Sequence, residues 1–280
     1  MAKGMSLHVG LNRVQFAAYG WSGSVDSCEN DALVMRDIAV NRGYKPTVLL
    51  TAEATRGRVV SVIKDAIVSL VAGDAFFITF SGHGMGSSEV IGGKVKADES
   101  WLLYDKPIID DEIHGLLKSF TGGVRILVVS ESCRSGTIIL PPALLKLEQE
   151  EPGAGLRALV EAPPRLSIPP EVVSSIRRHF SAYFSEVEEQ YKDRNLQELA
   201  AAVIQLSACQ QDQDAFIDGR HGVFTTKLLD VWSTGRFSGS HINFFDQVKA
   251  KMPAIDVQNP NYLAIGQNVA TFESGVPFTI

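Results

Sequence analysis

Short apolar runs recur along the chain and alternate with segments in which apolar residues return every three or four positions. The runs that are short enough for single strands cover residues 7–11, 47–51, 75–80, 124–130, 203–210 and 260–266. Most of them show little alternation with polar residues, which is typical of strands buried on both faces of a parallel sheet. The pattern therefore predicts an α/β fold with a mostly parallel six-stranded sheet and helices on both faces.

Helical periodicity fills the intervals between these runs. It predicts helices over residues 31–42, 55–70, 110–120, 171–190, 196–202, 222–232 and 242–252. Asp31 and Thr55 stand where the first two of these helices are expected to begin, and both residue types are good N-caps. Residues 81–100 are polar and rich in glycine, so no helix or strand is predicted there.

The composition narrows the class of protein. The chain has 280 residues, of which 45% are hydrophobic, enough for one sizeable core. A net charge of −6 gives no electrostatic footprint for nucleic acid. No apolar run approaches the length of about eighteen residues that indicates a membrane span, and no secretory signal is recognisable. The three cysteines lack the spacing of a disulfide framework or a zinc site. We therefore expect a cytoplasmic protein without nucleic-acid or membrane partners.

Two reactive side chains follow the two strongest predicted strands. His83 comes after residues 75–80 and Cys133 after residues 124–130, each in a turn rich in glycine and serine. Because the carboxyl ends of parallel strands meet at one edge of a sheet, both side chains are expected at that edge. A neighbouring histidine raises the thiolate fraction of a cysteine, and the N–H groups of Gly84 and Cys133 are placed to face an oxyanion. The pair predicts nucleophilic catalysis by cysteine.

The segments around these residues resemble a known family. ITFSGHG (residues 78–84) and ILVVSESCRSG (residues 126–136) are similar to the histidine and cysteine turns of caspase-like cysteine peptidases of clan CD. Within that clan the resemblance is to the metacaspases and bacterial orthocaspases of peptidase family C14. CENDALVM (residues 28–35) and LSACQQDQDAF (residues 206–216) are similar to further segments of the family. The resemblance implies a caspase-like fold.

The resemblance also implies a function and a set of site residues. It assigns His83 and Cys133 as the catalytic dyad of an endopeptidase, with Gly84 beside them. It implies a pocket for P1, the substrate residue before the cleaved bond, formed by Asp31, Glu131, Ser81 and Cys28. The family usually has aspartate where Glu131 stands and histidine where Arg134 stands. Acids in this pocket suit Arg or Lys at P1, and the aspartates of the later loop, Asp212, Asp214 and Asp218, disfavour an acidic substrate.

The domain organisation follows from the same resemblance. A single caspase-like peptidase domain is expected over residues 1–280, with a large-subunit-like part over 1–136 and a small-subunit-like part over 196–280. Between them, residues 137–195 form a proline-rich insertion followed by a helix, and seven prolines lie between positions 138 and 170. Caspase-like chains are often cut between their two halves. Self-cleavage is therefore expected in this insertion, with Arg157 and Arg165 as the best candidates.

The expected partners are protein or peptide substrates with a basic P1 residue, together with an unspecified regulatory partner, and the chain is expected to be a monomer. Many metacaspases are activated by Ca²⁺, and Asp98, Asp110 and Asp111 resemble part of the family's group of ligands. A further aspartate of that group, seven residues after the nucleophile, is replaced here by Leu140. We assign no metal and no cofactor.

Three alternatives stay open at this point. The chain is either an active peptidase or a catalytically silent scaffold with a caspase fold, and the presence of both His83 and Cys133 favours the former. A nucleotide-binding α/β domain is disfavoured because no glycine-rich phosphate-binding motif follows the first strand. For Asp31 alone, the simplest structural role is that of a helix cap.

Overall fold

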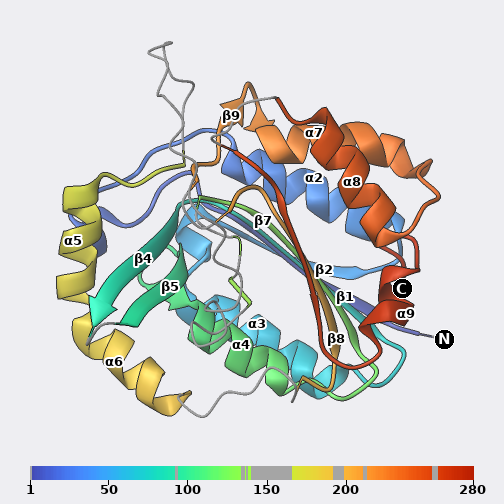
Figure 1. Cartoon of the computed structure of the whole chain (residues 1–280), viewed down its shortest axis with the longest axis horizontal. Coiled ribbons are helices and arrows are strands. Elements are labelled where there is room, and N and C mark those ends of the chain that lie inside the picture. The colour runs from blue at the N-terminus through green and yellow to red at the C-terminus, as the bar shows by residue number, and fades with distance from the viewer. Residues whose placement is uncertain are drawn as a thin grey trace.

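The computed structural model describes residues 2–91, 94–133, 136, 138–139, 166–191, 199–210, 213–253 and 258–280, with the side chains of residues 87–98 excepted. A six-stranded sheet in the order β11-β8-β7-β3-β1-β2 runs through its centre (Figure 1). Its strands are β1 (Gly4–Gly10), β2 (Lys45–Leu50), β3 (Ala75–Ser81), β7 (Arg125–Glu131), β8 (Ala202–Ser207) and β11 (Asn261–Ile265). Every neighbouring pair is parallel except β11 and β8. The predicted sheet is confirmed.

Helices cover both faces of this sheet (Figure 1). One face carries α3 (Arg56–Ser69) and α4 (Asp110–Lys118), and the other carries α2 (Cys28–Asn41), α7 (Val223–Trp232) and α8 (His241–Lys251). Each face has its own buried core. Val59 and Ile63 of α3 belong to one, whereas Met35 of α2 and Phe224 of α7 belong to the other. The two cores explain why the central strands are apolar on both sides.

The two predicted N-caps differ in outcome. The side chain of Thr55 accepts a hydrogen bond from the N–H of Arg58, as predicted. The prediction for Asp31 is wrong, because α2 begins at Cys28 with Ser27 in the cap position. Asp31 therefore lies one turn inside the helix and is 2% exposed. A buried carboxylate needs polar partners, and this one finds them on other elements rather than at its own helix terminus.

Two predicted helices are wrong in part. Residues 171–190 form two helices, α5 (Pro170–His179) and α6 (Ser181–Gln190), which are separated at Phe180. The ring of Phe180 is buried against Tyr19, a tertiary contact that helical periodicity does not encode. The helix predicted over 196–202 is absent where the structure describes this segment, since residues 199–201 are irregular and β8 begins at Ala202.

The polar segment that follows His83 forms a small antiparallel sheet that the sequence did not predict. Its strands are β4 (Gly84–Ile91), β5 (Lys94–Leu102) and β6 (Pro107–Ile109), in that order. The remaining short elements are α1 (Phe16–Tyr19), η1 (Thr51–Glu53), β9 (Ile217–Asp218), β10 (His221–Gly222), η4 (Ser233–Gly235) and α9 (Val269–Glu273). Glycine and short polar residues hide such strands from pattern analysis, because their pairing depends on the backbone.

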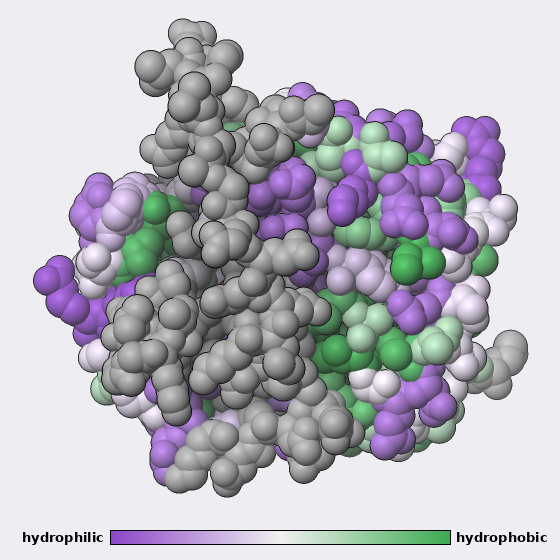
Figure 2. Space-filling view, viewed as in Figure 1, coloured by the Kyte–Doolittle hydropathy of each residue, from purple (hydrophilic) through white to green (hydrophobic). Residues whose placement is uncertain are grey.

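The surface seen in Figure 2 carries both hydrophilic and hydrophobic residues. Hydrophilic residues predominate over α7 and α8, whereas hydrophobic residues gather near β11 and α9. None of the helices in the described ranges has the length and apolar character needed to cross a bilayer.

Candidate active site

β3 and β7 end side by side and deliver the predicted dyad to one edge of the sheet. Ser81 of β3 is the register partner of Glu131 of β7, so His83 and Cys133 each lie two residues beyond a paired position. A Cβ added to Gly84 would lie 1.9 Å from the carbonyl oxygen of Cys133. Only glycine allows the two turns to approach this closely.

The imidazole of His83 is buried and lies between two backbone carbonyls. Its Nε2 is 2.6 Å from the oxygen of Gly23, and its Nδ1 is 2.9 Å from the oxygen of Leu166. Trp21 packs on the ring, with centroids 4.7 Å apart. Burial lowers the pKa of His83, which favours the neutral ring. A neutral imidazole has one N–H, so both contacts are hydrogen bonds only when the ring is protonated.

Cys133 is only 1% exposed and has partners of its own. Its Sγ accepts a hydrogen bond of 3.0 Å from the N–H of Ala215, a contact that favours the thiolate. The N–H of Leu166 donates to the carbonyl of Ala215 at 2.9 Å, and the side chain of Leu166 is buried in the same cluster as Cys133. Leu166 therefore links His83 to Ala215 and takes part in the packing that keeps the thiol from solvent.

Four residues of this arrangement were not found by sequence reasoning: Trp21, Gly23, Leu166 and Ala215. Gly23 and Ala215 act through backbone atoms, which leave no signal in side-chain type. Leu166 had a weak signal, since it is an apolar residue that follows the paired prolines 163 and 164 and the basic Arg165. Arg165 itself lies outside the described residues.

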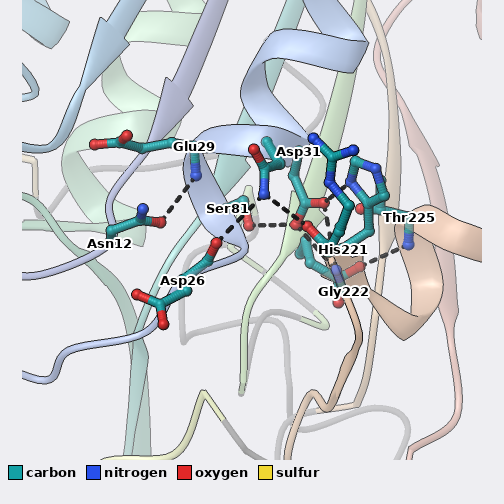
Figure 3. Close-up of polar contacts among 11 residues, drawn as sticks. Asn12, Asp26, Glu29, Asp31, Ser81, His221, Gly222 and Thr225 are labelled. Carbon is teal, nitrogen blue, oxygen red and sulfur yellow. Dashed lines mark hydrogen bonds and ion pairs between the residues drawn. The ribbon is translucent and has the colours of Figure 1, made fainter.

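The predicted pocket residues Asp31, Ser81, Glu131 and Cys28 also come together, and we call this group the acid pocket. Oδ1 of Asp31 accepts a hydrogen bond of 2.8 Å from Nδ1 of His221, and Oδ2 accepts one of 2.8 Å from the hydroxyl of Ser81 (Figure 3). The N–H of Gly222 lies 3.2 to 3.3 Å from both oxygens. Burial raises the pKa of Asp31, although these donors oppose the shift.

Glu131 is the second buried acid of the pocket. Its Oε2 accepts a hydrogen bond of 2.6 Å from the N–H of Thr225. Its Oε1 is buried and has no hydrogen-bond partner among the described residues. Burial, together with the nearby charge of Asp31, raises the pKa of Glu131 to about 8. Asp31 therefore lies close enough to disfavour the ionised form of Glu131.

Cys28 completes the pocket as a packing residue. It is fully buried, and burial raises the pKa of its thiol to about 12. Ser81 and Asp31 lie close enough to influence it. A thiol that stays protonated in this way is a poor nucleophile, in contrast to one that accepts a hydrogen bond as Cys133 does.

The beginning of α7 is a part of the pocket that sequence reasoning missed. The N–H groups of Gly222 and Thr225 point at the two carboxylates, and such groups at a helix N-terminus have no partner within their own helix. A Cβ on Gly222 would lie 2.1 Å from Cδ of Glu131, so glycine is required for this approach. The sequence HGVFTT predicted only the helix itself.

The family model of the caspase domain matches residues 9–269. The chain belongs to the caspase domain family. This membership confirms the expected family and the caspase-like fold, and it places the chain among the caspase-type cysteine peptidases. The caspase domain thus spans nearly the whole sequence, including both halves of the dyad and every residue of the acid pocket.

Relatives and a solved structure agree with this family. Metacaspase-1 of Schizosaccharomyces pombe is 30% identical over 128 residues, which are 40% of this chain and 30% of that protein. Metacaspase-1 of Plasmodium falciparum is 32% identical over 155 residues, 48% of this chain and 24% of that protein. The matched region is therefore less than a third of the length of each of these two relatives. The crystal structure of protein GSU0716 from Geobacter sulfurreducens is similar with a TM-score of 0.84 and 32% identity, and the match covers 99% of both chains.

The calcium ligands that the metacaspase resemblance suggested are not assembled into a site by the described residues. Both oxygens of Asp110 accept backbone hydrogen bonds, from Asp111 at 2.7 Å and from Glu99 at 3.2 Å. No group of three or more His, Cys, Asp or Glu side chains is arranged to hold a metal ion in the described part of the chain. The side chain of Asp98 and all of Leu140 lie outside it. We derive no catalytic step through a metal.

Some further predictions also fall outside the described residues. These concern Arg134, which stands where the family usually has histidine, Asp212 in the later loop, and Arg157 as a cleavage site. Of the other loop aspartates, Asp214 is half-buried, whereas Asp218 is exposed on β9.

Proposed function

We propose that this caspase-domain protein is a cysteine endopeptidase that cleaves protein or peptide chains after Arg or Lys. Cys133 is the nucleophile, His83 is the base, and the acid pocket receives the P1 side chain. The observation that carries the proposal is the state of Glu131, whose Oε1 lacks a hydrogen-bond partner among the described residues while the side chain is 2% exposed. A buried carboxyl oxygen without a partner is costly, and a guanidinium or ammonium group supplies the missing donor together with a charge that favours the ionised form of Glu131.

The geometry of His83 supports its role as base. The short contact of Nε2 with the carbonyl of Gly23 favours the tautomer with its proton on Nε2, which leaves Nδ1 as the acceptor. Nδ1 faces Leu166, which packs in the same cluster as Cys133. In the reaction, Nδ1 takes the proton of the Cys133 thiol, and the thiolate attacks the substrate carbonyl carbon.

The second half of the reaction uses the same groups. The imidazolium returns its proton to the leaving amine as the C–N bond breaks, and a thioester forms on Cys133. Water activated by Nδ1 then hydrolyses the thioester, which releases the acid product and restores the thiol. The N–H groups of Gly84 and Cys133 are the proposed donors to the oxyanion formed at each step.

A second candidate function is that of a catalytically silent scaffold with the same fold. It is favoured by the contacts of His83, whose two nitrogens face the carbonyls of Gly23 and Leu166. On that hypothesis the arrangement is permanent, and the dyad never engages a substrate. The two candidate functions differ in whether Leu166 can move away from His83 and Cys133.

A fluorogenic peptide panel with Arg, Lys, Asp or citrulline at P1 tests the proposal, with the Cys133→Ala protein as the blank. Cleavage of the Arg and Lys peptides alone, lost in the variant, is the expected result. The panel is run with and without Ca²⁺, because the family resemblance suggests an activator even though the described residues do not define its site. Cleavage after Asp overturns the P1 assignment, and no cleavage of any peptide or protein substrate supports the scaffold.

A further inference from the structure

His221 lies at the outer side of the acid pocket, where sequence reasoning placed no functional residue. We propose that His221 is a specificity-determining residue of this pocket, whose imidazole pairs with Asp31 when no substrate is bound and is displaced by the P1 cation. The inference rests on the proposed function and deepens it, because it concerns how the same pocket accepts its substrate.

The contacts of Asp31 single out His221 among its partners. The carboxylate is 3% exposed, and its other donors, the hydroxyl of Ser81 and the N–H of Gly222, are buried. His221 is 26% exposed and approaches Oδ1 to 2.8 Å. The imidazole therefore separates the carboxylate from solvent. A P1 cation that reaches Asp31 from solvent must replace it.

The surrounding backbone is held independently of this imidazole. His221 stands on β10, opposite Asp218 of β9, in a two-stranded hairpin that turns at Gly219 with a φ of 64°. The side-chain amide of Asn30 donates to the carbonyl of Arg220 at 3.0 Å and so ties the hairpin to α2. A change of rotamer at His221 is therefore enough to open the way to Asp31 without moving the hairpin.

The charged groups around His221 are mostly acidic. Asp31 pairs with it from α2, and Glu131 belongs to the same pocket from β7. Asp218 and Arg220 flank it on its own hairpin. A P1 cation that displaces the imidazole therefore meets the two acids of the pocket.

The exchange also affects selectivity between charged and neutral substrates. A neutral P1 side chain leaves the pair of His221 and Asp31 intact in the wild type. In a variant that lacks the imidazole, a neutral P1 side chain leaves Asp31 without a charged or strongly donating partner. A P1 Arg side chain, in contrast, takes the place of His221 and pairs with Asp31. Removal of His221 should therefore strengthen binding of Arg and increase the preference for Arg over its neutral isostere citrulline.

The kinetic test compares the wild type with His221→Ala and His221→Asn, with the exposed His179→Ala on α5 as the matched control. KM for a P1-Arg peptide is expected to fall about three- to tenfold in His221→Ala, because no imidazole then competes with the P1 cation for Asp31. His221→Asn keeps a hydrogen-bond donor on a shorter side chain, so it should show an intermediate KM. A rise in KM, or a KM equal to that of the wild type, overturns the inference.

A binding test separates this inference from the proposed function. The Cys133→Ala protein is titrated with the P1-Arg peptide and with its citrulline counterpart, while the imidazole signals of His221 are followed by NMR and assigned from their loss in His221→Asn. Movement of these signals with the Arg peptide alone is the expected result, even if the wild type cleaves neither peptide. An Arg peptide that binds, or is cleaved, while the His221 signals stay in place overturns the inference and leaves the proposed function intact. Absence of both binding and cleavage overturns both.

Discussion

The acid pocket and the dyad lie at the same edge of the sheet, but different kinds of structure hold them. Asp31 and Glu131 receive hydrogen bonds from β3, β10 and the beginning of α7, all of which are regular elements. His83 and Cys133 contact the backbones of Gly23, Leu166 and Ala215, all of which lie outside helices and strands. The pocket is thus held by the body of the fold, and the dyad by its loops.

This difference indicates which part must move for a substrate to bind. Irregular segments generally open at a lower free energy than the helices and strands of the core. We therefore expect the acid pocket to persist in solution, while the contact of Leu166 with His83 breaks when a substrate enters.

The largest effect is expected from removal of the nucleophile. Cys133→Ala should lower cleavage of the Arg peptide by at least about a thousandfold, because the change removes the thiol that is proposed to attack the substrate. The fold should survive, since the change removes one buried sulfur. Peptide hydrolysis and thermal unfolding measure the two effects. Cys209→Ala is the matched control, since Cys209 is also buried and its Sγ contacts the carbonyl of Ser132. Full activity in the Cys133→Ala protein would exclude the proposed nucleophile.

The next largest effect concerns the charge of the acid pocket. Asp31→Asn should lower kcat/KM for the Arg peptide roughly tenfold or more, because a buried charge-assisted hydrogen bond contributes about 1.5–3 kcal/mol. The citrulline peptide should be affected much less. Asp37→Asn is the control, since Asp37 lies on the same helix but is 59% exposed and pairs with Arg36. Equal losses for both peptides would mean that Asp31 supports the fold through Ser81 and Gly222 rather than binding P1.

The two regions also differ in how far they could be predicted from sequence. The sheet was predictable because each central strand is apolar, and the positions of His83 and Cys133 followed from the ends of two such strands. The acid pocket was predictable through family resemblance. The placement of Asp31 in this pocket came from that resemblance, whereas its sequence position alone led to the wrong prediction of a helix cap.

What could not be predicted consists mostly of backbone contacts between distant segments. The carbonyls of Gly23 and Leu166 and the N–H of Ala215 are available on any residue type, so nothing in the sequence distinguishes them. The hairpin of β4 and β5 was hidden for a similar reason, because its pairing uses backbone groups and its residues are small or polar. The break at Phe180 depends on a ring contact with Tyr19, more than 150 positions away.

A smaller effect is expected from loosening the segment that contacts the dyad. Leu166→Ala removes a fully buried side chain from the cluster that holds Cys133, which should weaken the local packing and raise peptidase activity several-fold. Initial rates with the Arg peptide measure this gain. Ile168→Ala is the control from the same segment, since Ile168 packs in a different cluster with Ile176 and Phe180.

The same segment gives the expectation of self-cleavage a specific form. Cleavage after Arg165 would create a new N-terminus at Leu166. In the intact chain, the N–H of this residue donates a hydrogen bond to the carbonyl of Ala215. Sequencing of new N-termini after incubation of the wild type should find Leu166, and none should appear in the Cys133→Ala protein. An unchanged chain that digests peptides would show that Leu166 moves aside without cleavage.

The smallest effect is expected in stability, from the second acid of the pocket. Because the pKa of Glu131 is raised from 4.5 to about 8, the native state keeps a proton that the unfolded chain releases between these values. Stability of the wild type should therefore fall as the pH rises through this window. Glu131→Gln cannot ionise, and the amide oxygen of the new side chain can still accept the hydrogen bond from the N–H of Thr225. The variant should therefore become more stable relative to wild type as the pH rises from about 5 to about 8. Urea unfolding at several pH values measures the difference, and the exposed Glu53→Gln should show no such trend. If the stability of wild type and of Glu131→Gln changes with pH in the same way, Glu131 is already ionised in the empty pocket. A P1 cation would then be attracted by a full negative charge on this side chain.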